Sequence, residues 1–201
     1  MATTTIDRRV ARTRAMLHEA LLSLIAEKRY ETITVEEICE RANTARSTFY
    51  AHYTDKDDLM RCGFKTLRET ILGRHNAVSA RGHPENPGVA FSLAMFEHAR
   101  DHAHLHRTLV GSRGGSIALD SVRRVLCEVV RAEFAAHGRR FSKDGLPREG
   151  VVQFVVGACM AVVTWWLEGG AKLSPSQIDA MFQRLVTKGI PHLGGSKQPC
   201  C

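Results

Sequence analysis

Residues 33–52 read Ile-Thr-Val-Glu-Glu-Ile-Cys-Glu-Arg-Ala-Asn-Thr-Ala-Arg-Ser-Thr-Phe-Tyr-Ala-His, and this stretch decides the fold of the first part of the chain. It predicts a short amphipathic helix, because Val35, Ile38 and Ala42 share one helical face. A turn at 43–45 separates this helix from a second short one. Two short helices joined by a turn of three or four residues form a helix-turn-helix unit, whose second helix can lie in the major groove of DNA.

Several residues of this stretch suit the positions that they take. Thr34 can cap the first helix, since its hydroxyl can accept hydrogen bonds from the free backbone amides of the opening turn. Asn43 is the non-glycine residue that best tolerates the left-handed conformation of such a turn. The second helix is expected to run from Arg46 to about His52, with Phe49 facing inward as its anchor.

The second helix and its surroundings carry the side chains that we expect to contact DNA. The first turn of a recognition helix reaches base edges, whereas donors elsewhere bind phosphates and so fix the register on the duplex. The DNA-binding residues expected from this stretch are Thr44, Arg46, Ser47, Thr48, Tyr50, His52 and Lys56.

The segment resembles the DNA-binding domain of the TetR/AcrR family of bacterial transcription regulators. The resemblance covers residues 8–60 and is carried by Thr34, Ile38, Ala42, the run 46–53 and the run 56–59. It implies that Tyr50, Lys56 and Thr34 contact phosphates and that residues 46–48 face bases.

Two positions depart from the family pattern. The family has Gly where Asn43 stands and Ser where Ala45 stands, just before the second helix. Because alanine cannot cap a helix, Thr44 is expected to supply the capping oxygen.

The net charge of +7 does not fall on the expected DNA-binding part. Residues 1–60 hold nine Lys/Arg and ten Asp/Glu, a balance of −1, and the remaining residues hold nineteen and eleven, a balance of +8. Within residues 1–60 the basic and the acidic side chains lie in separate clusters. Such local clustering of basic residues supports a DNA-binding face better than the net charge of the whole chain does. A basic arm comprises Arg8, Arg9, Arg12 and Arg14. These arginines can contact phosphates or form a solvated helix face.

The start of the chain gives an expectation about location. It is polar through Asp7 and has no apolar stretch before Ala15, so no signal peptide is expected. The six cysteines are scattered except for Cys200-Cys201, which indicates reduced thiols rather than a disulfide framework. We expect a bacterial, cytoplasmic, nucleoid-associated protein without a membrane span.

Helical periodicity continues along the rest of the chain, without strand-like alternation of useful length or an internal repeat. The expected fold is all-α, with an N-terminal three-helix DNA-binding domain at 1–60 that contains the helix-turn-helix at about 34–53. Residues 61–190 are expected to form a C-terminal helical domain that binds an effector and dimerises, and 191–201 a disordered tail. The glycine-rich run 111–116 is expected to be a loop.

Residues 151–167 are almost wholly apolar, interrupted only by Gln153 and Thr164. A helix that is apolar all round is buried or lies in a membrane, and this run falls just below the ~18–20 residues that a span needs. Burial on every side in so small a domain needs a second chain, so 148–188 is expected to form a homodimer interface. The resemblance implies the same pairing, through the last two long helices. The residues expected at the interface are Gly157, Ala161, Trp165, Trp166 and Phe182.

The resemblance also implies a ligand cavity in the second domain, with plain core packing as the alternative for each residue. The candidate lining residues are Phe64, Leu67, Ile71, Phe91, Met95, Leu109, Phe154 and Met160. The implied function is that of a repressor that responds to a small apolar effector and binds a palindromic operator in double-stranded DNA as a dimer. No catalytic residue, metal or cofactor is expected.

The stretch 97–106 supports an alternative, a metal-dependent enzyme. His98, His102 and His106 are spaced four apart and can share one helical face, where an adjacent carboxylate can assist a Zn²⁺ ion. Against this, no Glu lies between paired histidines as in the zinc hydrolase motif. The helix is also expected to end near His104, which would break the geometry.

Overall fold

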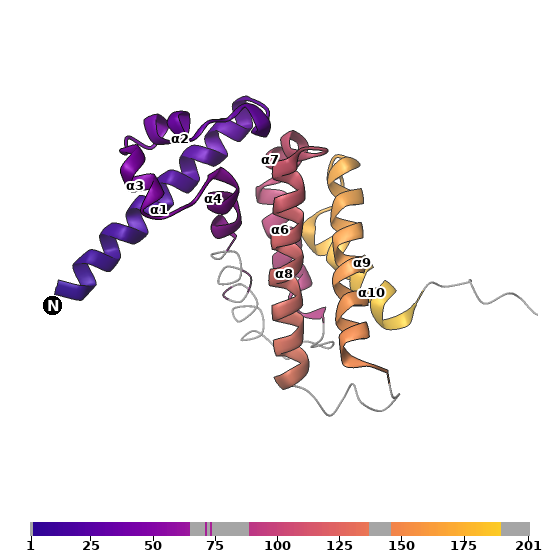
Figure 1. Cartoon of the computed structure of the whole chain (residues 1–201). Coiled ribbons are helices and arrows are strands. Elements are labelled where there is room, and N and C mark those ends of the chain that lie inside the picture. The colour runs from indigo at the N-terminus through magenta and orange to yellow at the C-terminus, as the bar shows by residue number, and fades with distance from the viewer. Residues whose placement is uncertain (1, 65–70, 72, 74–88, 137–145, 190–201) are drawn as a thin grey trace, which may run out of the picture. The chain divides into compact units, whose positions relative to one another are not determined.

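A computed structural model describes residues 2–64, 71, 73, 89–136 and 146–189. Within these ranges all regular structure is helical, so the expected all-α fold is confirmed. The helices labelled in Figure 1 are α1 (Ala2–Glu27), α2 (Val35–Arg41), α3 (Arg46–Tyr50), α4 (Lys56–Gly63), α6 (Ser92–Asp101), α7 (Ala103–Leu109), α8 (Arg113–Ala136), α9 (Arg148–Glu168) and α10 (Pro175–Lys188), and a short 3-10 helix, η1 (Tyr30–Thr32), lies between α1 and α2.

The chain forms two compact units. The first consists of Met1–Thr70 with His102–Leu126, and the second of Ile71–Asp101 with Cys127–Cys201. Helix α8 contributes its first part to the first unit and its last part to the second. The domain boundary expected after residue 60 stays a prediction, and the tail expected at the end of the chain lies outside the described residues.

An apolar stripe on α1 builds the core of the first unit. Leu17, Leu21 and Ile25 are buried at helical spacing, and α1 packs against α2, α4 and α7. Phe49 of α3 is fully buried in the same cluster, as its expected inward position requires. Burying a side chain of this size contributes about 1.5–3 kcal/mol. This anchor therefore holds α3, which has only five residues.

The glycine pair Gly114-Gly115 lies inside α8, so the loop expected at 111–116 is wrong for that part of the chain. A Cβ atom on Gly114 would lie 2.6 Å from Cγ of Tyr30, and one on Gly115 would lie 2.1 Å from the carbonyl oxygen of Leu109. Both positions need glycine because neighbouring atoms leave no room for a side chain. The glycines indicate close packing here rather than a turn.

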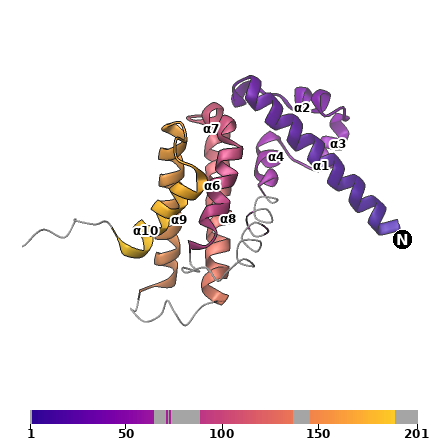
Figure 2. The ribbon, with the colours of Figure 1, turned by 180° about the vertical axis from the view of Figure 1, so that it is seen from behind.

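Helices α6, α9 and α10 lie side by side in the second unit (Figures 1 and 2). The ring centroid of Phe96 lies 5.8 Å from that of Trp166 and 5.9 Å from that of Phe182, both in edge-to-face arrangements. Such pairs stabilise a core beyond the area that they bury. Trp166 and Phe182 are 3% and 1% exposed. The expectation that these two residues lie at a dimer interface is therefore corrected, because they are buried in the core of their own chain.

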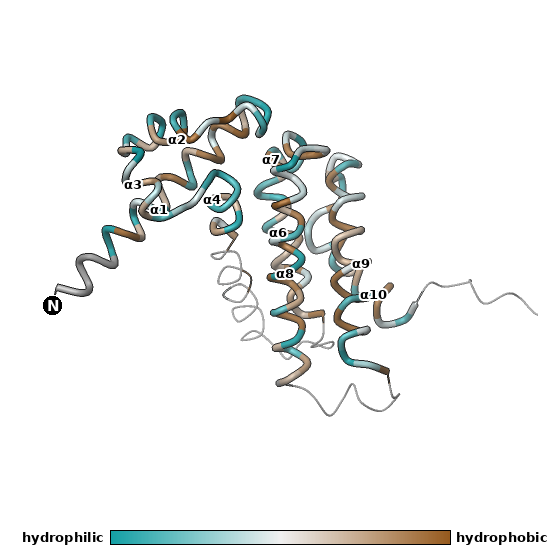
Figure 3. Tube along the Cα trace, viewed as in Figure 1, coloured by the Kyte–Doolittle hydropathy of each residue, from teal (hydrophilic) through white to brown (hydrophobic). Residues whose placement is uncertain are grey.

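Helix α9 is apolar along most of its length (Figure 3). Among the described residues it is the one helix whose length and composition would allow it to cross a membrane. One of its faces packs in the core, and another leaves Phe154 62% and Trp165 58% exposed, with the exposed Ala161 between them at helical spacing. Gly157 is half-buried. Large apolar side chains are thus exposed on one face of α9, and the homodimer interface expected there stays a prediction.

The residues expected to line a ligand pocket belong to both units. Phe64 and Leu109 pack with the core cluster of the first unit. Buried in the second unit are Ile71, Phe91 and Met95. Phe154 is exposed, Met160 is half-buried, and Leu67 lies outside the described residues. Ile71, Phe91 and Met95 are buried as core residues are, and the expectation that these residues line a cavity stays a prediction.

Asp179 of α10 is a buried carboxylate in the second unit. Its Oδ1 contacts Oγ of Ser92, and its Oδ2 accepts a hydrogen bond of 2.9 Å from Gln183. Ser92 Oγ also lies 2.7 Å from the carbonyl oxygen of Val89. A hydroxyl has one hydrogen and cannot donate to both oxygens, so both contacts are satisfied when Asp179 is protonated and donates to Ser92. Burial raises the pKa of Asp179, which favours the same state.

Replacing Asp179 with Asn should make the protein less sensitive to rising pH. Because the pKa of Asp179 is higher in the folded chain, its stabilisation is complete below the ordinary value of 3.8 and is lost as pH rises through the folded value. The melting temperature of Asp179→Asn relative to the parent should therefore increase from about pH 4 upward. Asp120→Asn, on an exposed position of α8, is the matched control and should follow the parent. A difference between Asp179→Asn and the parent that stays constant with pH would contradict a protonated Asp179.

Candidate nucleic-acid interface

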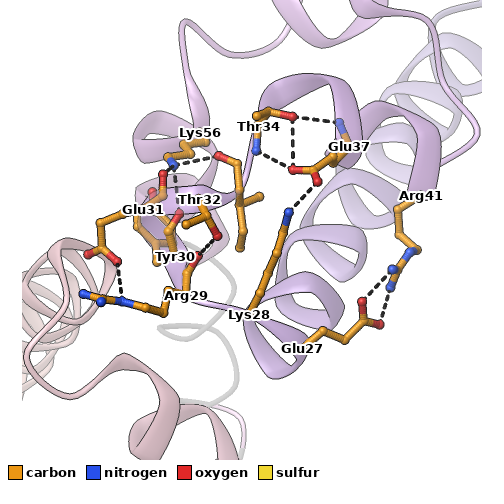
Figure 4. Close-up of polar contacts among 11 residues, drawn as sticks. Glu27, Lys28, Arg29, Tyr30, Glu31, Thr32, Thr34, Glu37, Arg41 and Lys56 are labelled. Atoms are coloured by element: carbon orange, nitrogen blue, oxygen red, sulfur yellow. Dashed lines mark hydrogen bonds and ion pairs between the residues drawn. The ribbon is translucent and has the colours of Figure 1, made fainter.

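Helix α2 begins with a reciprocal capping arrangement, shown in Figure 4. Oγ1 of Thr34 accepts a hydrogen bond of 3.2 Å from the backbone N–H of Glu37, and the Glu37 carboxylate accepts one of 2.9 Å from the backbone N–H of Thr34. Two backbone amides that the helix leaves unpaired are thereby satisfied. The expected capping role of Thr34 is confirmed. Its hydroxyl is therefore part of the helix start.

The turn between α2 and α3 is tight and depends on Asn43. This residue has a positive φ of 48°, as expected for the left-handed position. The following N–H, of Thr44, donates to the carbonyl of Cys39 at 2.9 Å. The N-cap of α3 is Ala45, which makes no side-chain capping bond. The expectation that Thr44 supplies a capping oxygen for α3 is wrong, because no side chain caps this helix.

The outer face of α3 is a donor surface. Arg46 and Ser47 are exposed and Tyr50 is 52% exposed, whereas Thr48 and His52 are half-buried. The hydroxyl of Tyr50, one turn beyond Arg46, interacts with the guanidinium group and raises the pKa of Arg46. Arg46 and Tyr50 therefore form one connected surface, and both can donate hydrogen bonds to an anion or a base edge.

Two ion pairs fasten α2 to the end of α1 (Figure 4). Lys28 pairs with Glu37 in the first turn of α2, and Arg41 in its last turn donates two hydrogen bonds of 2.7 and 2.8 Å to Glu27. Lys28, together with the backbone amide of Thr34, lowers the pKa of Glu37 to about 2. Because the pairs lie at the two ends of α2, together they fix its direction against α1.

Lys56, at the start of α4, is a structural residue. Its Nζ donates to the backbone carbonyls of Tyr30, Glu31 and Ile33 at 2.8, 3.1 and 2.7 Å (Figure 4). An ammonium group has three hydrogens, and these bonds use all of them. The same Nζ lies 4.8 Å from the ring centroid of Tyr30, and burial lowers the pKa of Lys56. The expected phosphate contact of Lys56 is not supported, because its donors already hold the connection between α1 and α2.

Tyr30 and Asp57 form a buried polar cluster that sequence reasoning missed. The Tyr30 hydroxyl donates to Oδ1 of Asp57 at 2.6 Å, and Arg113 of α8 donates to Oδ2 at 2.8 and 2.7 Å. Asp57 is 6% exposed, so the Arg113 charge is needed to compensate it. Burial and the hydrogen bond to Asp57 raise the pKa of Tyr30, and the Tyr30 and Arg113 hydrogen bonds lower the pKa of Asp57 against the effect of burial. Glu31 accepts from the backbone N–H of Arg113 at 2.9 Å.

The one sequence signal for this cluster was an aromatic residue, Tyr30, between charged residues in a short connection. An aromatic side chain in a polar connection between helices is usually buried against another element of the fold. The residue that accommodates its ring is Gly114, more than eighty residues later in the chain, whose missing side chain leaves room for the ring.

An open depression of about 330 Å³ lies over the turn between α2 and α3. Its lining residues are Glu36, Cys39, Glu40, Asn43, Thr44, Ala45 and Arg46. Because this lining holds two carboxylates and one guanidinium group, it does not suit a phosphate. Negative charge therefore marks one edge of the α3 surface.

The histidine stretch does not form a metal site within the described part of the chain. There, no group of three or more His, Cys, Asp or Glu side chains is placed to hold a metal ion. Helix α6 ends at Asp101 and α7 begins at Ala103, so the stretch 97–106 is not one helix. His98, His102 and His106 therefore do not lie on one continuous helix, and the enzyme alternative gains no support.

Comparison with protein families assigns both parts of the chain. Residues 17–61 match the model described as bacterial regulatory proteins, tetR family. Residues 90–188 match the model described as transcriptional regulator C-terminal region. The first match begins within α1 and ends within α4, and the second extends from just before α6 to the end of α10.

Two relatives match the chain over part of their length. The uncharacterized HTH-type transcriptional regulator YxbF of Bacillus subtilis (strain 168) is 48% identical over 56 residues, which are 27% of this chain and 15% of that protein. The HTH-type transcriptional regulator TcmR of Streptomyces glaucescens is 32% identical over 89 residues, which are 44% of this chain and 38% of that protein. The matched region is thus well under half the length of either relative.

The similarity to a solved structure extends over nearly the whole chain. The transcriptional regulator FadR from Bacillus subtilis, solved in complex with stearoyl-CoA, has a TM-score of 0.61 and 18% identity, over 88% of this chain and 98% of that one. At this identity the likeness shows a shared all-α fold.

Replacing Lys56 with Gln should destabilise the protein without changing how DNA binding depends on salt. Hydrogen bonds to a charged group contribute about 1.5–3 kcal/mol, so the melting temperature should fall. A lysine that contacts phosphate instead contributes about 1 to the slope of log affinity against log salt. That slope, measured on a bound DNA fragment below the melting temperature, should equal the parent's. If the slope of Lys56→Gln is smaller than the parent's by about 2, as expected for one lost phosphate contact in each protomer of a dimer, Lys56 contacts phosphate and its purely structural role is wrong.

Proposed function

This chain belongs to the TetR family of bacterial transcriptional regulators, and we propose that it is a ligand-responsive repressor that binds a palindromic operator as a homodimer. The observation that carries the proposal is the surface of α3. This helix buries Phe49, exposes Arg46, Ser47 and Tyr50, and follows a turn whose positive φ at Asn43 sets its direction.

The proposed DNA contacts follow from exposure and hydrogen-bonding capacity. Arg46 and Ser47, in the first turn of α3, face bases together with the half-buried Thr48. Tyr50 and His52 donate to phosphates that flank these bases. The remaining phosphate contact comes from the start of α3, at Thr44. Thr34 is left out of the proposed contacts because its N–H and its hydroxyl both donate to the Glu37 carboxylate. Lys56 holds the frame in which these residues are placed.

The proposed dimer forms through α9. Its exposed face presents Phe154 and Trp165, with Ala161 between them and the half-buried Gly157 nearby. Small residues let two helices approach closely, and the two large side chains supply contact area. A twofold pairing would place two copies of α3 in successive major grooves if they are about 34–36 Å apart. The operator would then be a palindrome.

The proposed effector is a small, largely apolar molecule bound in the second unit. Support comes from the family and from FadR of Bacillus subtilis, whose structure holds stearoyl-CoA. A ligand changes DNA affinity only by binding two conformations with different affinity, and a tenfold change requires about 1.4 kcal/mol. The repressor would act in the cytoplasm, on the DNA of the nucleoid.

Replacing Arg46 with Ala should weaken binding to a genomic DNA fragment that the purified protein captures. A charged base contact is worth about 1–3 kcal/mol, so losing one in each protomer should lower the affinity at least tenfold at fixed salt. Titration by fluorescence anisotropy measures the change. The matched control is Arg124→Ala, at an exposed position on α8, which should bind like the parent. If Arg46→Ala keeps its melting temperature and also binds like the parent, α3 is not the recognition helix.

A further inference from the structure

Helix α1 is longer than its packing in the first unit requires. It begins at Ala2, yet among residues 8–27 the first buried side chain is that of Leu17. Figures 1 and 2 show α1 continuing toward the N-terminus past the other helices of its unit. Residues 8–14 are half-buried or exposed, so burial of apolar surface does not explain why the helix extends there.

The side chains of this extension are strongly basic. Arg8, Arg9, Arg12 and Arg14 are all exposed, and residues 8–18 contain no Asp or Glu. Among the side chains that the structure describes, no carboxylate forms an ion pair with these guanidinium groups.

This distribution of charge opposes the helix that carries it. Arg8 and Arg12 are four residues apart, where like charges destabilise a helix. A bound polyanion would offset this repulsion between the arginines. The extension therefore suits binding better than it suits folding alone.

The position of the extension identifies which polyanion it can reach. Leu17, one turn after Arg14 on α1, packs in the same core cluster as Phe49 and Tyr53. The ring of Tyr53 packs against Phe49 of the recognition helix, with centroids 5.8 Å apart. From Arg14 to Arg8 the helix rises by about 9 Å. The basic extension therefore starts beside α3 and continues beyond it.

We propose that the extension of α1, through Arg8, Arg9 and Arg12, binds the phosphate backbone of the DNA just outside the base pairs that α3 reads. This rests on the proposed function, since α3 must bring the duplex to the extension. Guanidinium groups suit phosphate because they bind its oxygens in a bidentate manner and always keep their charge. The contact would add affinity without adding sequence information.

The first experiment needs only the parent protein. Its affinity is measured on two duplexes that share the same bound sequence, one ending at the outer edges of the half-sites and one extended by about one helical turn of unrelated sequence on each side. The longer duplex should bind at least tenfold more tightly, with a steeper dependence on salt. Equal affinities and equal salt slopes on the two duplexes would overturn the proposal.

The second experiment locates the effect on the three arginines. The variant Arg8→Gln/Arg9→Gln/Arg12→Gln should lose the preference for the longer duplex, and its salt slope should fall by about 2 or more, since each phosphate contact contributes about 0.9 and each site occurs twice in a dimer. The control Arg107→Gln/Arg123→Gln/Arg124→Gln removes the same charge from exposed positions on α7 and α8 and should behave like the parent. Glutamine is a good helix former, so circular dichroism should show unchanged helix content.

The outcomes separate this proposal from the one on which it rests. If the parent binds no DNA, the proposed function fails. If the parent binds but the arginine variant keeps both the salt slope and the preference for the longer duplex, the extension is a solvated helix and the DNA-binding function stands. If the control variant loses as much as the arginine variant, total charge rather than the extension governs affinity, and the proposal fails.

Discussion

Tyr30 is the residue on which the arrangement of the first unit depends. Its carbonyl and ring both contact the Lys56 ammonium group, and its hydroxyl donates to the buried carboxylate of Asp57. Arg113 neutralises that carboxylate, and the absence of a side chain at Gly114 makes room for the ring. Three parts of the first unit therefore meet at the side chain of Tyr30. They are the connection between α1 and α2, the start of α4 and the start of α8. A change at Tyr30 would leave Asp57 with one partner fewer and would open a space beside α8.

This cluster matters because the recognition helix cannot position itself. Helix α3 has five residues and no side-chain cap, and isolated helices shorter than about 12–15 residues are marginal in water. Its placement comes from the burial of Phe49 and from α2, which two ion pairs hold against α1. The donors that face outward on α3 are thus set by a rigid frame, which lowers the entropy lost when they bind DNA.

Local rules predicted the part of the site that depends on neighbours in the sequence. The capping of α2 by Thr34, the left-handed Asn43 and the buried Phe49 each involve contacts within a few residues or a helical period, so the sequence contains them directly. Other contacts of the site join residues far apart in the sequence. They are the hydrogen bonds of Lys56 and those of the Tyr30–Asp57–Arg113 cluster, which join residues up to 56 positions apart. The periodicity of the sequence does not predict such contacts.

The second unit shows the same limit. Helix α9 is apolar on nearly every side, so its pattern did not reveal that Trp166 faces the core whereas Trp165 faces outward. The glycines at 114 and 115 resembled a loop by composition, although packing and not backbone freedom requires them. Composition and spacing therefore predicted the class of fold and the kind of site, whereas the phase of an apolar helix and the partners of buried charges depend on tertiary packing.

The proposed function requires that two copies of α3, each held in place by the packing of its own unit, bind one DNA duplex together. The most direct test is selection of binding sites from a pool of random duplexes by the purified protein, followed by sequencing of the bound fraction. The expected result is an inverted repeat whose half-site centres are separated by about one helical turn, or 10–10.5 base pairs, or by a multiple of it. Enrichment of no sequence, or of a single half-site without its inverted copy, would contradict the claim.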